Sequence, residues 1–371
     1  MKNEINTIKG VNLGNWLVLE KWMKPSMFAD VEAEDETWLC RRLSEEEKES
    51  RYHAHRSSYI TREDFSFLAA HGFNAVRLPI PYFVLESQDG FLSCAQQVED
   101  AMNWAKENGI QILLDLHTVP GGHNGTDNSG ICGVCKWSVV PENRMRTLEI
   151  LEGIAKRWGL CESLWGIEVI NEPMCSDAPW GQYMSIQALS TVYPPEDPEE
   201  AKGSDNYTLA YLRDFYRDAY RVMRKHMPVE KKIVFSDAFW LDCWDDFYAD
   251  PSFEGIVMDT HQYLAMPELA FGETRSIEKY EAHLHTLASQ LAKVSEKFPV
   301  IVGEWSLSSR MTDLDGASQE EKERLIKRLA DSYLNAVSNT LGWFYWNYRI
   351  DAPEEEKMIW DVHNCLPYIN F

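Results

Sequence analysis

Residues 300–306 read Val-Ile-Val-Gly-Glu-Trp-Ser, an apolar run that ends in one acidic side chain, Glu304. A continuous run of β-branched residues is typical of a strand that is buried on both faces in a parallel sheet. Ile233-Val234-Phe235 is a second run of this kind. Such strands need helices on both faces of their sheet, so the two runs predict an α/β fold.

Similar runs recur along the whole chain of 371 residues. We expect eight strands, at Ile8–Asn15, Asn74–Tyr82, Gln111–Thr118, Leu164–Pro173, Lys232–Ala238, Gly255–Tyr263, Val300–Ser306 and Leu341–Tyr348. Helices are expected between them because apolar residues recur there at helical spacing. The clearest helical segments are Ala95–Asn108, Glu142–Trp158, Lys279–Phe298 and Glu320–Val337.

Eight strand–helix units without a break in composition predict one closed (β/α)8 barrel over residues 1–371. A doubly wound open sheet is the alternative, but no glycine-rich phosphate loop follows the first strand to support it. Two connections exceed ordinary length: the charged, helix-prone insertion Val31–Thr61 after the first strand, and the loop Met174–Ser204 after the fourth. Both leave the face where barrel active sites sit, so we expect them to shape the mouth of a pocket.

The formal net charge is −23, from 59 acidic and 36 basic residues. This field repels nucleic acids and anionic membranes as partners, whereas a short neutral oligosaccharide is indifferent to it. No apolar run approaches the ~20 residues that span a bilayer. Because residues 1–6 contain no apolar part of a secretory signal, we expect a cytoplasmic protein whose eight cysteines are reduced. The oligomeric state is left open.

Two glutamates end apolar strands at equivalent places, Glu172 in Ile170-Asn171-Glu172-Pro173 and Glu304 in Val302-Gly303-Glu304-Trp305. They follow the fourth and seventh expected strands, so both project onto the catalytic face from roughly opposite sides of a narrow mouth. Hydrolysis of a glycoside with retention needs two carboxyl groups about 5 Å apart, one protonated and one ionised. The pair therefore predicts this chemistry, although either glutamate alone could equally be a capping or salt-bridging carboxylate.

Six further polar or aromatic side chains follow the strands. They are Arg77, His117, Asn171, His261, Tyr263 and Trp346. Together with the two glutamates, this set resembles the constellation of glycoside hydrolase family 5, and the resemblance covers essentially the whole chain. It implies a (β/α)8 barrel and a retaining double displacement. We expect neither a metal ion nor another cofactor.

The N-terminal stretch is similar to the opening of one branch of that family, the glucan 1,3-β-glucosidases. It reads Gly10-Val11-Asn12-Leu13-Gly14-Asn15-Trp16-Leu17-Val18-Leu19-Glu20, and Asn124-Gly125-Thr126-Asp127-Asn128-Ser129-Gly130 supports the same resemblance. In that branch the residues that match Glu20 and Asn128 hold hydroxyl groups of the terminal sugar. The resemblance thus implies exo action on the non-reducing end of a short β-linked oligosaccharide.

The resemblance and the chemistry of the side chains together assign the reacting groups. Glu304 is expected to attack the anomeric carbon as a carboxylate, with Tyr263 and Arg77 bonded to it and keeping it ionised. Glu172 is expected to protonate the leaving oxygen and then to activate the water that releases the glycosyl enzyme.

The remaining four residues are expected to hold the sugar. Asn171 is placed to bond the 2-hydroxyl group, a contact that strengthens in the transition state. His117 and His261 would orient hydroxyl groups and the acid/base residue. Trp346 would form the floor under the reacting ring.

The sequence departs from its relatives on the acceptor side. Fungal exo-1,3-glucanases clamp the sugar beyond the cleavage point between two Phe side chains, and the matching positions here are Thr126 and Met266. A related bacterial subfamily acts instead as a β-mannosidase on mannosyl-β-1,4-N-acetylglucosamine, so glucose and mannose both stay open as glycone. A catalytically inactive carbohydrate-binding barrel is the alternative from another class, but both carboxylates are present.

Four weaker features have a structural reading beside a functional one. The Cys132-Gly133-Val134-Cys135 motif has no second ligand pair at zinc spacing, so we expect reduced thiols. Trp137, Trp180 and Trp240 could each stack on a sugar or pack in the core.

Overall fold

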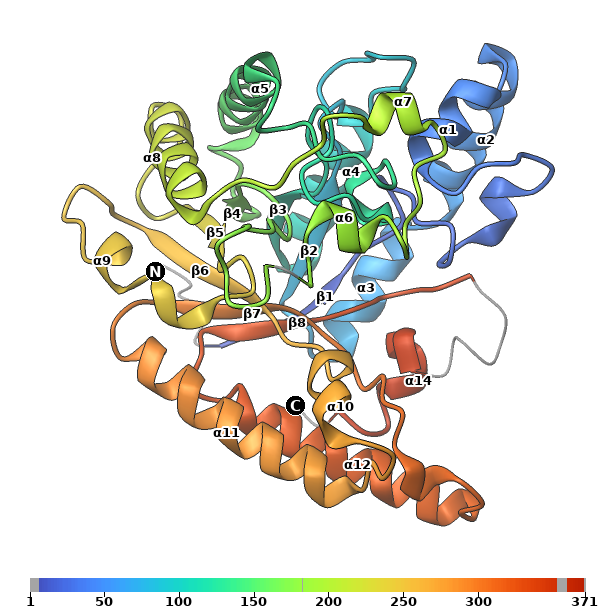
Figure 1. Ribbon diagram of the computed structural model, residues 1–371, viewed down its shortest axis with the longest axis vertical. Coiled ribbons are helices and arrows are strands. Elements are labelled where there is room, and N and C mark those ends of the chain that lie inside the picture. Colours follow the sequence, from blue (N-terminus) through green and yellow to red (C-terminus); the bar gives the residue numbers. More distant parts are fainter. Residues whose placement is uncertain (1–6, 182, 352–358, 370–371) are drawn as a thin grey trace.

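The computed structural model describes residues 7–181, 183–351 and 359–369, which form a closed barrel of eight parallel strands in chain order (Figure 1). The strands are β1 Ile8–Asn12, β2 Ala75–Ile80, β3 Gln111–Leu116, β4 Leu164–Glu168, β5 Lys232–Ser236, β6 Ile256–His261, β7 Val300–Trp305 and β8 Gly342–Tyr345. β8 closes the ring on β1, with Gly342 opposite Ile8. The expected barrel and all eight expected strands are confirmed. A single domain over residues 1–371 stays a prediction.

Helices cover the outside of the barrel (Figure 1). The longer ones are α3 Arg62–Ala70, α4 Ala95–Asn108, α5 Pro141–Trp158, α8 Leu209–Arg224, α11 Ile277–Ser295 and α12 Gln319–Ala336. Val98, Ala101, Met102 and Ala105 of α4 are buried, because the helical period brings them to the side that packs on the strands. The four helical segments expected from the sequence are therefore confirmed. Further short helices are η1 Pro25–Phe28, η2 Asp127–Ser129, η3 Leu241–Cys243, α9 Asp245–Tyr248, α10 Ala265–Phe271, η4 Thr312–Leu314 and α14 Val362–Cys365.

Both long connections contain structure of their own. The insertion after β1 forms α1 Glu36–Arg42 and α2 Glu45–Ser58. Ser44 starts α2 with a capping box, in which its hydroxyl and the Glu47 carboxylate satisfy each other's backbone N–H groups. The loop after β4 contains α6 Ile186–Leu189 and α7 Pro198–Ala201, and Figure 1 shows α7 beside α1.

An apolar layer fills the barrel in the N-terminal half of its strands. Every strand contributes one side chain to it: Ile8, Ala75, Leu113, Trp165, Val234, Val257, Ile301 and Phe344. Gly10 lies two residues after Ile8 and so faces the same interior. A Cβ atom on Gly10 would lie 2.2 Å from Cδ1 of Phe344. The missing side chain therefore leaves room for the aromatic ring.

Strand β7 breaks its alternation just where Glu304 lies. Ile301 faces the interior, and so does Gly303, because a Cβ on Gly303 would meet the Asp259 carboxylate at 1.9 Å. Regular alternation would then turn Glu304 outward. The register of β7 shifts at this point against both neighbouring strands, a bulge that re-aims the side chain. Glu304 thus also points inward, where it reaches Arg77.

Among the described residues, no helix combines the length and the apolar composition that crossing a bilayer requires. Residues 1–6, on which the expectation of a cytoplasmic location partly rests, lie outside the described part of the chain. That location stays a prediction.

Substitution of Gly10 tests the packing of the apolar layer. Gly10→Ala is expected to lower the free energy of unfolding by about 1–3 kcal/mol, because the added methyl group must displace the Phe344 ring. In the double variant Gly10→Ala/Phe344→Leu the smaller side chain makes room, so the two losses should not add. Urea unfolding of the three variants checks this, and strictly additive losses would contradict it.

Candidate active site

Arg77 lies at the centre of the barrel interior, fully buried above the apolar layer. Its guanidinium contacts side chains from five strands or their ends: Asn12 at 3.1 Å, Asp115 at 3.0 Å, Glu168 at 2.8 Å, Asn171 at 2.8 Å, Asp259 at 3.8 Å and Glu304 at 2.7 Å. Burial lowers the pKa of Arg77, but the surrounding carboxylates outweigh burial and hold it well above its usual value. The fixed cation therefore joins opposite sides of the barrel through one planar group.

The carboxylates around Arg77 do not share the same protonation tendency. Burial raises the pKa of Asp115, but the charges of Arg77 and His117 and the hydrogen bond from His117 outweigh it and lower the pKa. Burial raises the pKa of Glu168 well above its usual value, and repulsion from Asp259 and Asp115 adds to the rise. The charge of Arg77 opposes both effects but offsets them only in part. The charge of Arg77 therefore helps to lower the pKa of Asp115 but does not prevent the rise for Glu168. Of these two carboxyl groups, Glu168 is the one that tends to stay protonated.

Sequence reasoning missed Asp115, Glu168 and Asp259. A signal for two of them was present, because Asp115-Leu116-His117 and Asp259-Thr260-His261 place an acid and a histidine two residues apart on a strand. A period of two puts both side chains on one face, here the barrel interior. Glu168 carries no comparable signal.

Glu304 receives two hydrogen bonds that suit an ionised carboxylate. Arg77 Nη1 donates to Oε1 and the Tyr263 hydroxyl donates to Oε2, each at 2.7 Å. Burial raises the pKa of Glu304 above its usual value, and the charges of His261 and Arg77 offset that rise only in part. Both bonds had been predicted from the sequence.

Glu172 lies at the opposite side of the mouth, at the end of β4. His261 Nδ1 lies 2.8 Å from its Oε1, and Asn128 Nδ2 donates to its Oε2 at 2.7 Å. Its backbone has φ 40°, a left-handed value that is costly for a residue with a side chain. Strained backbone of this kind clusters at functional sites, where the surrounding structure holds it in place.

The two glutamates face each other across a short gap. Ligand atoms of Glu172, His261 and Glu304 all lie within 4.8 Å of one another. Retaining glycosidases hold their two carboxyl groups about 5–5.5 Å apart, whereas inverting enzymes leave about 6.5–9.5 Å for a water molecule. The gap therefore fits direct attack by one carboxylate.

His261 and Glu172 shift each other's pKa through their hydrogen bond. Burial lowers the pKa of His261, but the charges of Glu304 and Asp259 and hydrogen bonds to Asp259 and Glu172 raise it well above the usual value. Burial raises the pKa of Glu172, but the His261 bond and the nearby imidazole charges outweigh it and bring the pKa to about 2. Both shifts arise in part from the same hydrogen bond, so the two groups titrate as a pair.

Glu20 and Asn128 reach the site from the loops after β1 and β3. Trp22 Nε1 donates to Glu20 Oε2 at 2.8 Å. Burial raises the pKa of Glu20 well above its usual value, and the charges of Asp127, Glu304 and Glu172 add to the rise. The expected hydroxyl-binding residues therefore do lie near the catalytic pair, and Asn128 already holds Glu172.

Asn171, His117 and Trp346 complete the interior wall. Asn171 Oδ1 accepts from Arg77, and its Nδ2 lies 3.4 Å from His117 Nε2. His117 Nδ1 lies 2.5 Å from Asp115 Oδ2, which orients the ring. The rings of His117 and Trp346 stack at a centroid distance of 5.9 Å. The structure therefore brings every expected site residue into one region, while the individual roles stay predictions.

The insertion after β1 braces the loop that carries Asn128. Asp35 Oδ2 accepts the N–H of Cys132 at 2.8 Å. Thr37 Oγ1 donates to the carbonyl of Gly130 at 2.6 Å. These contacts hold the loop from its outer side, so α1 takes part in positioning Asn128.

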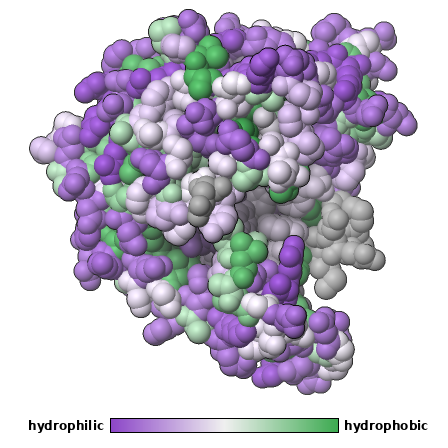
Figure 2. All heavy atoms as spheres, in the orientation of Figure 1, coloured by the Kyte–Doolittle hydropathy of each residue, from purple (hydrophilic) through white to green (hydrophobic). Residues whose placement is uncertain are grey.

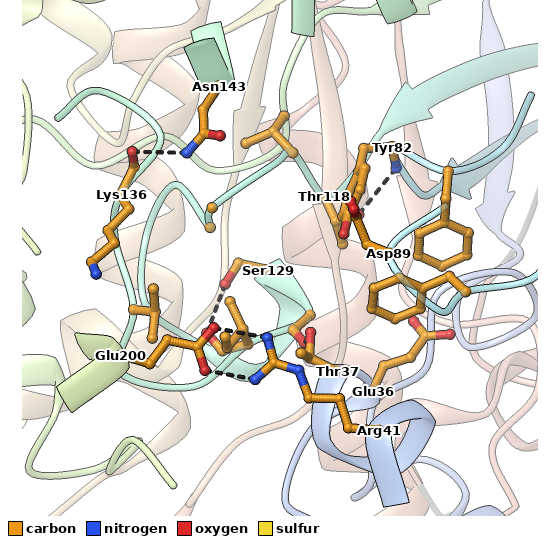
Figure 3. A pocket seen from close by; sticks show the side chains of 18 residues that line it. Glu36, Thr37, Arg41, Tyr82, Asp89, Thr118, Ser129, Lys136, Asn143 and Glu200 are labelled. Carbon is orange, nitrogen blue, oxygen red and sulfur yellow. Dashed lines mark hydrogen bonds and ion pairs between the residues drawn. The ribbon is translucent and has the colours of Figure 1, made fainter. Parts of the chain in front are cut away.

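A polar cavity of about 340 Å³ remains between α1, α7 and this loop. Figure 3 shows Arg41 and Glu200 facing each other beside it, joined by hydrogen bonds of 2.6 and 2.8 Å. The ion pair connects the insertion to the loop after β4. The expectation that both long connections shape the mouth is consistent with this contact.

Trp137 was left open between core packing and sugar stacking, and Thr126 matches a clamp position of the fungal relatives; both are structural residues here. Trp137 is fully buried, with its ring packed edge-on against Tyr207 and Phe215, so it is a core residue. Thr126 is also buried, and its hydroxyl donates to Asn128 Oδ1 at 2.6 Å. Thr126 therefore supports Asn128 and offers no surface to an acceptor.

Comparison with known proteins shows that the chain is similar to glycoside hydrolases over most of its length. The model of the family described as Cellulase (glycosyl hydrolase family 5) matches residues 43–351. The chain is 33% identical to the probable glucan 1,3-beta-glucosidase A of Emericella nidulans, over 97% of this chain and 88% of that protein. It is 27% identical to the sporulation-specific glucan 1,3-beta-glucosidase of Saccharomyces cerevisiae, over 97% and 84%. The crystal structure of rutinosidase from Aspergillus niger shares the fold, with TM-score 0.74 and 19% identity over 99% of this chain and 98% of that one.

Substitution of Arg77 tests how much the buried cation contributes to the stability of the fold. Arg77→Met leaves several buried carboxyl groups without their partner and is expected to lower the free energy of unfolding by about 3–5 kcal/mol. Arg62→Met is the matched control, because its ion pair with Glu107 is 62% and 46% exposed and should contribute at most about 1 kcal/mol. Equal losses in chemical unfolding of the two variants would refute the central role of Arg77.

Proposed function

Because the chain belongs to glycosyl hydrolase family 5, we propose that Glu304 and Glu172 hydrolyse a terminal β-glycosidic bond by double displacement. The protein is a retaining β-glycoside hydrolase. The observation that carries the residue assignment is the gap of at most 4.8 Å between the two carboxyl groups and His261. Glu304 has two donors that stabilise its ionised form, and Glu172 has a neighbour that stores a proton. The two groups are therefore suited to different roles.

In the first step Glu304 attacks the anomeric carbon and forms a glycosyl ester. Arg77 and Tyr263 hold its two oxygens, so one oxygen must exchange its hydrogen bond for the new covalent bond. Glu172 gives a proton to the glycosidic oxygen, which leaves with the electron pair of the broken bond.

The hydrogen bond between His261 and Glu172 supplies that proton. As negative charge leaves Glu304 and grows on the leaving oxygen, the proton passes from Nδ1 to Oε1 and on to the substrate. In the second step the pair takes a proton back from water, which attacks the anomeric carbon and frees Glu304. His261 is thus a positioning residue that keeps the acid/base residue supplied.

The proposed substrate is the non-reducing end of a short β-linked oligosaccharide, with glucose as the terminal sugar. The names of the curated relatives support glucose and a 1,3 linkage for this chain. Glu20 and Asn128 support exo action, because both lie near the catalytic pair and the residues that match them in the glucan 1,3-β-glucosidase branch hold the terminal sugar.

Glu304→Gln tests the nucleophile. The neutral amide cannot form the ester, so turnover of an aryl β-glucoside should fall by several orders of magnitude while the thermal unfolding midpoint stays close to that of the wild type. Glu304→Gly with added azide should release a glycosyl azide of inverted configuration. Glu296→Gln, at an exposed end of α11, is the control and should keep full activity. Near-normal turnover by Glu304→Gln free of deamidation would disprove the assignment.

His261→Gln tests whether His261 supplies the proton of Glu172, and the readout is the pH profile of kcat/KM. The raised pKa of His261 keeps a proton on the pair as pH rises past the ordinary histidine range, and activity is lost as pH rises through the pair's own pKa. Glutamine holds no such proton, so the alkaline limb should move to lower pH. His71→Gln alters an exposed imidazole on the outside of the barrel and should leave the limb unchanged. An unmoved limb in His261→Gln would show that the pair does not share the acid proton.

A further inference from the structure

Asp259 is a buried aspartate in the middle of β6. Figure 2 shows the molecule hollowed near the centre of one face, but Asp259 has no part in the surface because it is 0% exposed. A substrate in the site therefore does not touch Asp259. Any effect of this side chain on a reaction must pass through its neighbours, and two of these neighbours lead to the catalytic glutamates.

The first carboxylate oxygen of Asp259 holds the bulge of β7. The register between β6 and β7 skips Gly303, the residue before Glu304, so Gly303 has no partner on β6. Asp259 Oδ1 accepts the N–H of Gly303 at 2.6 Å, and Asn12 Nδ2 donates to the Gly303 carbonyl at 2.9 Å. Two buried side chains thus satisfy both backbone polar groups of the bulged residue, which fixes the bulge that turns Glu304 inward.

The position of Asp259 also explains why residue 303 is a glycine. A Cβ atom on Gly303 would lie 1.9 Å from Asp259 Oδ2 and 2.4 Å from Oδ1. Any side chain at this position would push the carboxylate out of its place. Gly303 and Asp259 therefore fit only together.

The second carboxylate oxygen faces the histidine that is bonded to the acid/base residue. Asp259 and His261 lie two residues apart on β6, so both side chains point into the barrel. Asp259 Oδ2 lies 3.5 Å from His261 Nε2, and neither atom has a closer hydrogen-bond partner in the described part of the chain. The other ring nitrogen, Nδ1, lies 2.8 Å from Glu172 Oε1.

At 3.5 Å the contact between Asp259 and His261 is at the long limit of hydrogen bonding, so it acts chiefly through charge. Burial lowers the pKa of His261, but the charges of Glu304 and Asp259 are the largest of the effects that raise it well above its usual value. The carboxylate of Asp259 therefore favours the imidazolium form of the ring.

We propose that Asp259 positions both catalytic carboxyl groups, because its Oδ1 holds the bulge that directs Glu304 and the charge at its Oδ2 keeps a proton on the ring that bonds Glu172. The inference rests on the proposed function and adds Asp259 and Gly303 to it as positioning residues. One buried carboxylate thereby links the geometry of the nucleophile to the proton of the acid/base residue.

Other titratable and charged side chains surround His261 as well. They are Arg77, Asp115, His117, Glu168, Glu172, Asp237, Tyr263 and Glu304. All of them stay in place in a variant of Asp259 alone. A change in the titration of His261 in such a variant therefore reports the loss of the Asp259 charge.

Asp259→Asn and Asp259→Ala separate the two contacts in the pH profile of kcat/KM for an aryl β-glucoside. Asparagine keeps an oxygen that accepts the Gly303 N–H but removes the charge beside Nε2, so the alkaline limb should move to lower pH. Alanine removes both contacts, so its maximum should lie about ten-fold or more below that of Asp259→Asn. Gly303→Ala should also lower the maximum, because the methyl group displaces the carboxylate.

Two controls identify the route of the effect. In Asp259→Asn/His261→Gln the limb should move no further than in His261→Gln alone, because the charge acts through the ring. Asp64→Asn removes a buried aspartate at the start of α3, where it bonds Tyr348 and Arg349 on the outside of the barrel. This variant should leave the limb unchanged, whatever its effect on stability.

NMR titration of the enzyme with labelled histidine and without substrate separates the inference from the proposed function. The His261 signal, assigned by its absence in His261→Gln, should titrate at lower pH in Asp259→Asn than in the wild type. That result supports the inference even if no β-glycoside is hydrolysed, an outcome that refutes only the proposed function. An unchanged His261 titration in Asp259→Asn would overturn the inference. So would equal maxima of kcat/KM in Asp259→Asn, Asp259→Ala and Gly303→Ala.

Discussion

The site depends on one buried cation, the guanidinium of Arg77, in a protein with a formal net charge of −23. Carboxyl groups from β3, β4, β6 and β7 converge on the barrel interior and would repel one another without it. The planar fork contacts several of them at once, and it also holds Asn12 and Asn171. The same set of contacts therefore links five strands inside the barrel and orients Glu304.

This arrangement also explains how two glutamates of the same chemistry take different parts. Arg77 and Tyr263 donate to Glu304 from fixed positions, so this carboxylate has lasting support for its charge. Glu172 has instead a histidine whose proton can move along a 2.8 Å hydrogen bond. An acid/base residue must lose and regain a proton in each cycle, and a nucleophile must not need one. Glu304 and Glu172 therefore differ in role because different side chains at the strand ends lie next to them.

Much of this could be predicted from the sequence. The apolar runs identified all eight strands, because strands buried on both faces have few other possible compositions. Glu172, Glu304 and the bonds of Tyr263 and Arg77 to Glu304 were predicted from residues at the ends of these strands together with the resemblance to glycoside hydrolase family 5. Glu168 could not be found, because a lone acid in an apolar run has no spacing that separates it from a surface residue.

Other features depend on contacts between distant segments. The bulge at Gly303 is set by the fit of β7 against β6 and β8, which no local pattern encodes. Trp137 is a core residue because Tyr207 and Phe215 surround it from later in the chain. Thr126 matches a clamp position of the fungal relatives, but it is buried and its hydroxyl donates to Asn128.

The most direct test of the account is the configuration of the sugar that is released first. Proton NMR of the hydrolysis of an aryl β-glucoside, recorded before mutarotation, distinguishes the two anomers. Attack by Glu304 across a gap of at most 4.8 Å predicts that the β-anomer forms first and that the α-anomer grows in slowly. First appearance of the α-anomer would mean direct displacement by water and would contradict the assignment of Glu304 as nucleophile.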